Sequence, residues 1–410
     1  MQQLIETVII GAGQAGLAVS HLLTRASREH LLLDRARAAS AWRDKRWDSF
    51  RLVLPNRYWC MPGMLYDGAE PDGFMAAREV VERFDRYLGK TRPPLHEHTA
   101  VRRVLLQGPR RFLVQTDRGD LRCRNVVVAT GPFQTPALPA WRHALDAEVV
   151  QLHSEQYRNP SQLPPGAVLV AGSGQSGVQI AEELLRDGRR VLLCTGGRGW
   201  LPRRYLGKDI TAWYAEMGLF ETRIDEFPSL AAARASGFPQ LAGDAALGHT
   251  LNVHTLAQAG AVLLGRAEQG AGHEIRVAGL QANLDAADAV AARAKGLIDE
   301  HIARRHGSVP PGSDDPWPLY GRGGIEQRDS IDLRREGVRS IVWAGGYRPD
   351  YAFLDIPVLD ADGRPQHRRG VSEVPGLFFI GLEWLHRRKS STLMAGDEDA
   401  ALIAATIAAG

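Results

Sequence analysis

The chain is poor in cysteine and carries little net charge. Its 410 residues include three cysteines, Cys60, Cys123 and Cys194, and none of them forms a CxxC pair or a spacing typical of metal ligands. We therefore expect no disulfide framework, no dithiol redox centre and no metal site. The formal net charge of +3 is too small to indicate nucleic acid or an acidic membrane surface as the main partner.

Long apolar runs are also missing. No run of about 18 apolar residues occurs, so a membrane-spanning helix is not expected. The first residues, MQQLIETVIIGAG, lack the charged start and the cleavage site of a signal peptide. These absences favour a cytoplasmic protein that does not associate with a membrane.

Glycine is plentiful, with 43 residues, and two glycine clusters repeat one pattern. GAGQAG (11–16) follows the apolar run TVII, and GSGQSG (172–177) follows AVLVA. Each motif opens a segment with the apolar spacing of a helix. The two motifs are separated by the length of a domain, which indicates that one nucleotide-binding unit occurs twice in the chain. The sequence therefore predicts an α/β fold with two Rossmann-like dinucleotide-binding domains.

The first motif has every part of a dinucleotide-binding fingerprint. In that fingerprint Gly11 permits the tight turn, Gly13 lets the backbone approach a pyrophosphate, and Gly16 allows close packing of helix on strand. The free N–H groups of the helix start attract phosphate. Asp34 ends the next apolar strand, LLLD, where a carboxylate binds a ribose diol.

The second motif, with Gly172, Gly174 and Gly177, lacks that acid. The strand RVLLC is followed by Thr195, and four basic residues come soon after it, Arg198, Arg203, Arg204 and Lys208. Guanidinium groups bind phosphate through paired, charge-assisted hydrogen bonds. The pattern favours NADPH over NADH, and the alternative is a solvated basic loop. Two such motifs in one chain indicate a flavin and its hydride donor.

The rest of the chain predicts how the domains are divided. We expect an amphipathic helix over 76–90, a small antiparallel excursion over 100–124 and a long helix over 283–305, followed by the linker GSVPPGSDDPWP. The FAD domain is predicted to be discontinuous, with residues 1–160 and 322–410. The NADPH domain, residues 161–321, is predicted to be inserted into it.

Several segments outside the glycine motifs resemble one family. In chain order they are GAGQAG, WRDKRWDSFRLVLPN, VVVATGPFQTPALP, QLHSEQYRNP, GSGQSG, WAGGY and VPGLFFIGLEW, followed by AGDEDAALIA. Their order and spacing resemble the flavin-containing monooxygenase superfamily, the class B flavoprotein monooxygenases. Within it, the chain is most similar to the bacterial branch that resembles plant indole-pyruvate monooxygenases.

The resemblance implies a set of cofactor contacts. It places Trp42 and Arg43 beside the flavin, Thr130 and Gly131 in the motif that links the domains, and Gly381 in the turn near the isoalloxazine ring. Together with the motifs above, the cofactor-binding residues that we expect are Gly11, Gly13, Gln14, Gly16, Asp34, Arg35, Trp42, Arg43, Val101, Thr130, Gly131, Gly172, Ser173, Gly174, Gln175, Ser176, Gly177, Arg198, Arg203, Arg204, Gly345 and Gly381.

Two residues are catalytic candidates, each with a structural alternative. Asn56, in the segment LPN, matches a position near the flavin C4a atom, whereas turn asparagines are common for local reasons. His153 keeps its place in the superfamily fingerprint, although Ala147 and Val149 stand where that fingerprint has Phe and Gly. This departure weakens assignment to the Baeyer–Villiger and N-oxide subclasses. The alternative for His153 is a hinge or packing residue.

The resemblance implies a single-component monooxygenase. NADPH would reduce FAD, and a flavin C4a-(hydro)peroxide would transfer one atom of O2 to a small organic substrate without a separate reductase. A homodimer is possible within this family. Two alternatives stay open: an NAD(P)H-dependent flavin oxidoreductase or oxidase without oxygen transfer, and a non-enzymatic flavoprotein regulatory subunit.

Overall fold

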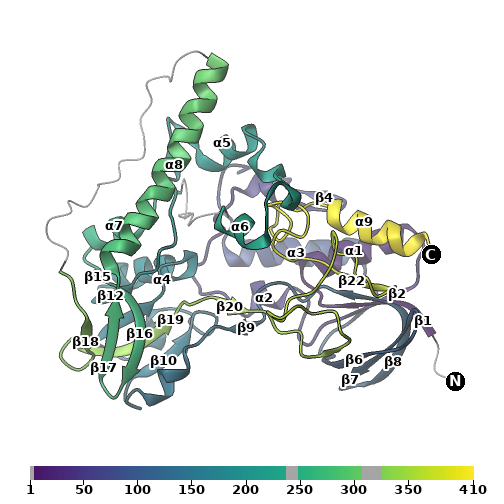
Figure 1. Cartoon of the computed structure of the whole chain (residues 1–410), viewed down its shortest axis with the longest axis horizontal. Helices are drawn as coiled ribbons and strands as arrows, with labels where there is room; N and C mark the ends of the chain where they lie inside the picture. Colours follow the sequence, from purple (N-terminus) through teal and green to yellow (C-terminus); the bar gives the residue numbers. More distant parts are fainter. Residues whose placement is uncertain (1–3, 237–247, 307–325) are drawn as a thin grey trace.

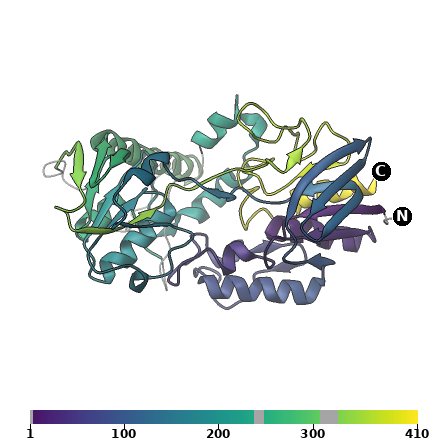
Figure 2. The same cartoon turned by 90° about the horizontal axis from the view of Figure 1, so that it is seen from below.

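The computed structural model describes residues 4–236, 248–306 and 326–410. In this part of the chain the elements form two lobes, each built on its own β-sheet, and two extended segments join them (Figures 1 and 2). The predicted fold class, two Rossmann-like units in an α/β chain, is confirmed.

The first lobe is built on an eight-stranded sheet. Its strands are β1 (Leu4–Ile10), β2 (His30–Leu33), β5 (Leu95–His96), β6 (Val101–Gly108), β7 (Arg111–Thr116), β8 (Gly119–Val128), β21 (Leu354–Asp355) and β22 (Leu377–Phe379). β1 lies between β2 and the second half of β8, parallel to both, and β22 adds to β8 in parallel. β6, β7 and the first half of β8 are antiparallel, which confirms the excursion predicted over 100–124.

Helices cover the first sheet. They are α1 (Gln14–Arg25), α2 (Ser40–Arg43), α3 (Ala77–Thr91) and α9 (Glu398–Ala408), and a short hairpin of β3 (Cys60–Met61) and β4 (Met64–Leu65) lies near them. α1 packs against α9, and both contribute to one apolar core with α3. The predicted amphipathic helix over 76–90 thus corresponds to α3, which buries Val80, Phe84 and Tyr87.

The second lobe is built on a five-stranded parallel sheet. Its strands, in spatial order, are β10 (Val150–His153), β19 (Val338–Trp343), β11 (Ala167–Ala171), β12 (Val191–Cys194) and β15 (Val262–Leu264). A second, antiparallel sheet consists of β16 (Arg266–Ala271), β17 (Glu274–Ala278) and β18 (Ser330–Asp332). α4 (Gln175–Arg186) and α7 (Val253–Gln258) pack on the parallel sheet.

An excursion of the second lobe reaches towards the first. It contains β13 (Arg204–Tyr205), β14 (Lys208–Asp209), α5 (Ile210–Glu216) and α6 (Leu230–Ala235). Figure 1 shows α5 and α6 between the lobes, and the long helix α8 (Leu280–His306) projecting beyond the parallel sheet. α8 confirms the helix predicted over 283–305. The predicted linker at 307–318 and the predicted boundary at 321–322 lie outside the described residues.

The sheets change the domain division that the sequence predicts. β10 and β19 pair with each other and β19 pairs with β11, so residues 150–153 and 338–343 belong to the second lobe and not to the first. The crossing segments are β9 (Thr135–Pro136) and β20 (Tyr347–Arg348), which form an antiparallel pair between the lobes. The three parallel strands β11, β12 and β15 are extended on one side by β19 and then β10, and for this reason the crossover lies nearer residues 136 and 347.

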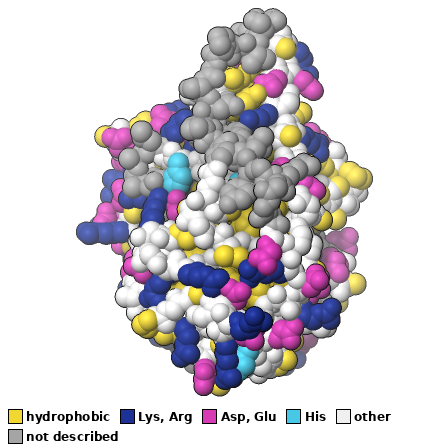
Figure 3. All heavy atoms as spheres, turned by 90° about the vertical axis from the view of Figure 1, so that its left-hand side faces the viewer, with side chains coloured by type: hydrophobic (Ala, Val, Ile, Leu, Met, Phe, Trp, Pro, Cys, Tyr) yellow, Lys and Arg dark blue, Asp and Glu magenta, His cyan; other side chains and the backbone are white. Residues whose placement is uncertain are grey.

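The described surface is chemically mixed. Figure 3 shows the end of the molecule formed by the second lobe, where basic and acidic side chains are intermingled over the part of this face that is not grey. Among the described ranges, no helix combines the length and the apolar character needed to cross a membrane.

Candidate functional site

The first glycine motif forms a tight turn between β1 and α1. The φ of Gly11 is +109°, and its N–H donates to the Leu33 carbonyl at 2.7 Å. A Cβ at Gly11 would lie 2.6 Å from the Ala129 carbonyl oxygen, and one at Gly16 would lie 1.9 Å from the Gly11 oxygen. Both positions therefore require glycine, for turn geometry at Gly11 and for helix packing at Gly16.

Gly13 differs because the space that its side chain would occupy is open. No heavy atom lies within 4 Å of the position its Cβ would take. Gly13 is the N-cap of α1, no side chain caps this helix, and its first turn has no acidic residue. The first N–H groups of α1 thus point into open space with the positive end of the helix dipole. This geometry fits a pyrophosphate that approaches the backbone.

The second glycine motif repeats this geometry atom for atom. The φ of Gly172 is +127°, and a Cβ there would lie 2.5 Å from the Ala344 oxygen. A Cβ at Gly177 would lie 1.8 Å from the Gly172 oxygen, whereas one at Gly174 would meet no atom within 4 Å. The segment after Ala344 thus packs on the second motif as the segment after Ala129 packs on the first.

One buried atom in the second motif lacks a partner. Gln175 and Gln14 hold equivalent positions at the first residue of α4 and α1. Gln14 Nε2 donates to the Thr392 carbonyl at 2.6 Å, whereas Gln175 Nε2 is buried and has no hydrogen-bond acceptor among the residues that the structure describes. A buried donor without an acceptor costs free energy. A nucleotide bound at Gly174 would bring acceptor oxygens to this place, so the residues present fit such a group.

Asp34 follows the end of β2, beside the first glycine turn. Its carboxylate accepts from the N–H groups of Ala12 and Ala36, both at 2.8 Å. Burial raises the pKa of this carboxyl group, and the two N–H donors oppose the rise. Asp34 thereby connects the end of β2 to the glycine turn. Arg35, next to it, is exposed.

The equivalent place in the second lobe has no carboxylate. The Thr195 hydroxyl donates to the Leu264 carbonyl at 2.7 Å, and the Gly196 N–H donates to Ser173 Oγ at 3.0 Å. Arg198 follows and is exposed. A Cβ at Gly196 would lie 3.8 Å from a guanidinium nitrogen of Arg266, so Arg266 stands beside the same turn. No local sequence pattern indicates Arg266, because its position depends on the pairing of β12 with β15.

Two of the predicted phosphate ligands are wrong or weakened. The Arg203 side chain is 0% exposed; it binds both oxygens of Asp209 at 2.7 and 2.8 Å and the Val53 carbonyl at 2.8 Å. This buried ion pair joins the excursion to the first lobe, which leaves Arg203 unable to reach a phosphate. Arg204 donates to the Gly248 carbonyl at 3.0 Å and is half-buried. Of the predicted arginines, Arg198 remains exposed beside the motif.

Asn56 is a structural residue. It begins the short 3-10 helix at 56–58 and is 4% exposed. Its amide NH2 donates to the Glu70 carbonyl at 2.8 Å, and its amide oxygen accepts from the Met75 N–H at 2.7 Å. These bonds fasten the 66–75 segment. The catalytic role predicted for Asn56 is therefore not supported, and the turn alternative accounts for the residue.

His153 also has a structural place. It ends β10, is 2% exposed, and packs edge-on against Tyr347 of β20. Its Nδ1 accepts from the Glu155 N–H at 3.3 Å, and its Nε2 lies 3.1 Å from the Gly346 carbonyl. Burial lowers the pKa of His153, so the ring is neutral and its Nε2–H donates to Gly346. The hinge alternative explains these contacts, and direct catalysis stays a prediction.

The segment around Trp42 connects the two lobes. Arg46 stacks 5.0 Å from the Trp42 ring, and burial lowers the pKa of this guanidinium. The neighbouring Lys45 forms an ion pair with Glu155 of the second lobe at 3.0 Å. Arg43 donates to the Ala38 carbonyl at 2.9 Å, which ties α2 to the turn after β2. These contacts fix Trp42 near the boundary between the lobes.

The segments that pack on the two glycine motifs lead into the same crossing. Thr130 and Gly131, which follow β8, are held by Gln134 at 2.6 and 3.0 Å, and the chain then enters β9. Gly345 follows β19, and a Cβ there would lie 3.0 Å from the Ala137 oxygen. β9 and β20 pair directly. The segments that follow β8 and β19, beside the two motifs, therefore meet at the crossing.

A loop at 381–397 closes over the start of α1. Gly381 has a φ of +75°, and a Cβ there would lie 3.0 Å from the Ala15 Cβ. α9 begins at Glu398, so the segment between Gly381 and this helix is a loop, and the contact of Gly381 with a flavin ring stays a prediction. Trp384 in this loop has a φ of +56° and is 5% exposed. The predicted contact of Val101, the first residue of β6, also stays a prediction.

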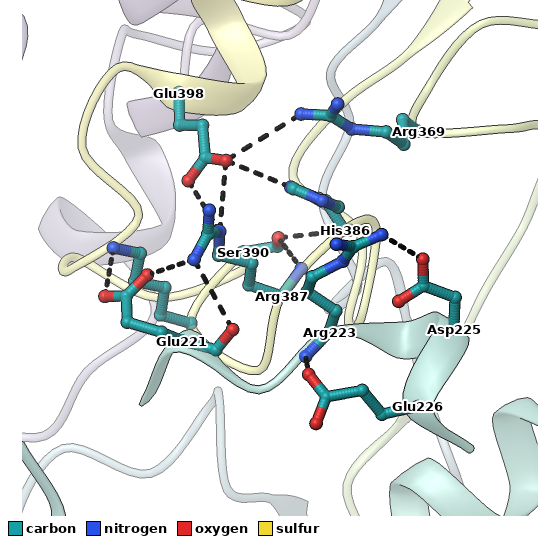
Figure 4. Close-up of polar contacts among 10 residues, drawn as sticks. Glu221, Arg223, Asp225, Glu226, Arg369, His386, Arg387, Ser390 and Glu398 are labelled. Atoms are coloured by element: carbon teal, nitrogen blue, oxygen red, sulfur yellow. Dashed lines mark hydrogen bonds and ion pairs between the residues drawn. The ribbon is translucent and has the colours of Figure 1, made fainter. Parts of the chain in front are cut away.

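A cluster of charged residues connects the excursion to this loop (Figure 4). We call this cluster the charged latch; it consists of Glu221, Arg387, Lys389 and Glu398. Arg387 lies between two carboxylates, Glu221 of the excursion at 2.8 Å and Glu398 of α9 at 3.0 Å. Lys389 adds a second contact to Glu221. The Ile224 N–H donates to the His386 carbonyl at 2.9 Å. The latch covers the loop beside the first motif, and it was not foreseen from the sequence, because its residues are distant in the chain.

Two of the three thiols are held in the protonated form by burial. None of the three cysteines, all of which lie in the described ranges, forms a disulfide. Burial raises the pKa of Cys123 and Cys194 to about 12. Both are therefore protonated at neutral pH and unreactive.

Because His153 is buried at the junction of β10 and β20, we expect the stability of the protein to fall in acid. The folded protein holds His153 with a lowered pKa, while the unfolded chain protonates it with a pKa of about 6.5. The unfolded state therefore binds more protons below that pH, and the free energy of unfolding falls as the pH drops, by at most about 1.4 kcal/mol per pH unit from this residue. Urea unfolding between pH 7.5 and 5.5 should show a smaller decrease in His153→Gln than in the wild type. Equal decreases in the two proteins would contradict this account.

The comparisons with known proteins agree with this arrangement. The family model described as pyridine nucleotide-disulphide oxidoreductase matches residues 8–217. The uncharacterized oxidoreductase CzcO of Bacillus subtilis is 32% identical over 97% of both chains. The probable indole-3-pyruvate monooxygenase YUCCA7 of Arabidopsis thaliana is 29% identical over 49% of each chain. A flavin-containing monooxygenase from Stenotrophomonas maltophilia shares the fold, with a TM-score of 0.65, 20% identity and coverage of 100% of this chain and 99% of that one.

Proposed function

Because the chain belongs to the pyridine nucleotide-disulphide oxidoreductase family, we propose that it is a single-component monooxygenase that inserts one atom of O2 into a small organic substrate. FAD binds at the first glycine motif and NADPH at the second. When bound, this pair supplies the redox chemistry, hydride transfer to the flavin and activation of oxygen. The chain itself binds both nucleotides, orients them and limits the access of water.

The observation that carries the proposal is the exact repetition of an open glycine turn in two lobes that share one crossing. The space beside Gly13 and Gly174 is open to a pyrophosphate, whereas a Cβ at the flanking glycines would collide with backbone oxygens. In this proposal Asp34 binds the ribose of FAD. Lys45 pairs with Glu155 of the second lobe, and His153 contacts Gly346 next to the crossing segment. These contacts hold the two lobes in a defined relative position. This relative position matters because hydride transfer needs the nicotinamide and flavin rings in contact.

The second lobe favours NADPH through two arginines. Arg198 and Arg266 stand at the turn after β12, where the ribose 2′-phosphate of NADPH would lie, and no carboxylate competes there. Removing both guanidinium groups should lower kcat/KM for NADPH about 100-fold, roughly tenfold for each charge-assisted contact, and leave NADH almost unaffected. Steady-state kinetics with both coenzymes measures this ratio. Arg276→Ala, on the neighbouring strand β17, is the matched control, and an unchanged ratio in the Arg198→Ala/Arg266→Ala double variant would exclude this site.

The charged latch keeps the loop at 381–397 closed over the reaction space. Phe227 of the excursion packs edge-on against Trp384 at 5.2 Å, and Arg234 pairs with Glu383 at 3.3 Å. The excursion thus covers the loop with apolar and paired side chains. Exclusion of water prevents loss of activated oxygen as hydrogen peroxide.

Loosening the latch should therefore uncouple the enzyme. Glu221→Gln removes the carboxylate that holds Arg387 and Lys389. Because Glu221 is about half exposed, we expect a modest effect, roughly a two- to fivefold rise in hydrogen peroxide formed per NADPH oxidised. Asp225→Asn, which removes a carboxylate that pairs within the excursion, should leave this ratio unchanged. An equal rise in both variants would show that the latch does not control coupling.

The competing function is an oxidoreductase that uses the same nucleotides without oxygen transfer. The two functions differ in where oxygen goes. A monooxygenase incorporates label from 18O2 into a product and consumes NADPH faster when its substrate is present. A screen of small ketones, 2-oxo acids, amines and sulfides for substrate-dependent NADPH loss, followed by mass spectrometry of the products, tests the proposal. Complete recovery of the consumed oxygen as hydrogen peroxide with every compound would favour the oxidoreductase.

A further inference from the structure

A basic pocket lies at the end of the first lobe that is opposite to its glycine motif. Its volume is about 370 Å³, and it is lined by Leu4, Glu6, Arg28, Pro109, Arg110, Arg111, Arg124, Asn125 and Gly410. Leu4 begins β1, whereas the glycine turn follows the last residue of this strand. Seven residues of strand separate them, so the pocket is roughly 20 Å from the turn.

Two buried donors in this pocket lack acceptors. Arg28 forms an ion pair with Glu6, and Arg110 donates to the Asn125 side-chain oxygen at 2.8 Å. The Nε atoms of Arg28 and Arg110 are nevertheless buried without a hydrogen-bond partner. Each such N–H loses its bond to water on folding and gains nothing in return. An acceptor brought by a ligand would remove this cost.

The other two arginines carry uncompensated charge. Arg111 and Arg124 are exposed, and neither guanidinium group forms a hydrogen bond or an ion pair with any residue in the described ranges. Glu6 is the one acidic side chain in the lining, and it is already engaged by Arg28. The side chains of the pocket therefore present four guanidinium groups against one carboxylate, and the carboxyl group of Gly410, the last residue of the sequence, adds a second negative charge. The balance of charge is still positive and attracts anions.

We propose that this pocket binds a small phosphate-bearing anion at a site separate from the two nucleotide sites. Phosphate oxygens accept hydrogen bonds and donate none when fully ionised, which matches the free N–H groups. Guanidinium groups bind such oxygens in pairs with fixed geometry. In open α/β sheets nucleotides bind beyond the carboxyl ends of the strands, so a pocket beside the first residues of β1 is not a part of the FAD site.

Inorganic pyrophosphate is the probe that tests this site. The full chain, loaded with FAD and saturated with NADP+ so that both glycine turns are filled, is titrated calorimetrically with pyrophosphate. We expect saturable binding of one pyrophosphate per chain. Arg111→Gln and Arg124→Gln should each weaken binding about tenfold, and the double variant about 100-fold. Both side chains are exposed and unpaired, so these variants should fold normally, with unchanged flavin content.

The matched control is Arg118→Gln. Arg118 is exposed in the turn between β7 and β8 and does not line the pocket, so this variant removes the same charge elsewhere on the same sheet. Its affinity should equal that of the wild type. Three outcomes would overturn the proposal: no saturable binding, an equal loss in Arg118→Gln, or binding of a long polyanion such as heparin without binding of pyrophosphate. Flavin reduction is not measured, so failure here is independent of the proposed monooxygenase activity.

Discussion

Gly174→Val should lose NADPH binding without losing its fold. The φ and ψ of Gly174 are −74° and −178°, values that valine adopts readily, and no atom lies within 4 Å of the new Cβ. The side chain would instead fill the space through which the pyrophosphate approaches the start of α4. Loss of the charge-assisted hydrogen bonds there should weaken NADPH at least about 100-fold. Titration of NADP+ against flavin absorbance measures the affinity, and thermal unfolding measures the fold.

Two further variants make this result specific. Gly177→Ala should damage the second lobe itself, because its Cβ would lie 1.8 Å from the Gly172 oxygen, and its thermal midpoint should fall. Gly13→Val should reproduce the effect of Gly174→Val on the other nucleotide, with FAD lost and NADP+ binding retained. Normal NADPH affinity in Gly174→Val would mean that the second motif is not a nucleotide site.

Asp34→Ala should yield a protein that fails to retain FAD. The substitution removes the acceptor of the Ala12 and Ala36 N–H groups, each bound at 2.8 Å, and with it the group expected to bind the ribose. Two charge-assisted bonds of about 1.5–3 kcal/mol each correspond to a loss of FAD affinity of at least about 100-fold. Flavin content after dialysis and a fluorescence titration of the apoprotein provide the measurement.

Asp34→Asn separates shape from charge. Asparagine keeps one acceptor oxygen and the same size, so its FAD affinity should fall between those of the wild type and Asp34→Ala. If Asp34→Ala retained FAD as tightly as the wild type, the first lobe would bind its nucleotide by another route.

The sequence predicted the parts of the fold that depend on local pattern. The spacing of glycines after an apolar strand dictates a strand, a turn and a helix, because Gly16 and Gly177 each face a carbonyl oxygen of their own turn. The helix at 77–91 and the antiparallel strands over 101–128 follow from equally local patterns of apolar residues. These predictions hold without knowledge of any long-range contact.

The sequence predictions that failed concern residues whose role depends on their tertiary contacts. Arg203 was expected at a phosphate, but Asp209 lies opposite its neighbour in the hairpin of β13 and β14 and neutralises it. The domain boundaries moved because the short strands β10 and β19 join a sheet that only tertiary pairing defines. Arg266 and the charged latch were missed for the same reason. In these cases the outcome depends on which strands pair and which residues lie opposite each other, and spacing along the sequence does not report this.

Anaerobic mixing of the FAD-loaded wild type with NADPH tests the central claim most directly, because hydride passes only between two nucleotides held in contact. The account predicts that the flavin is bleached in a first-order phase, faster with NADPH than with NADH, and that Gly174→Val keeps its yellow colour under the same conditions. A wild-type flavin that stays oxidised with saturating NADPH, or a Gly174→Val flavin that bleaches at the wild-type rate, would contradict it.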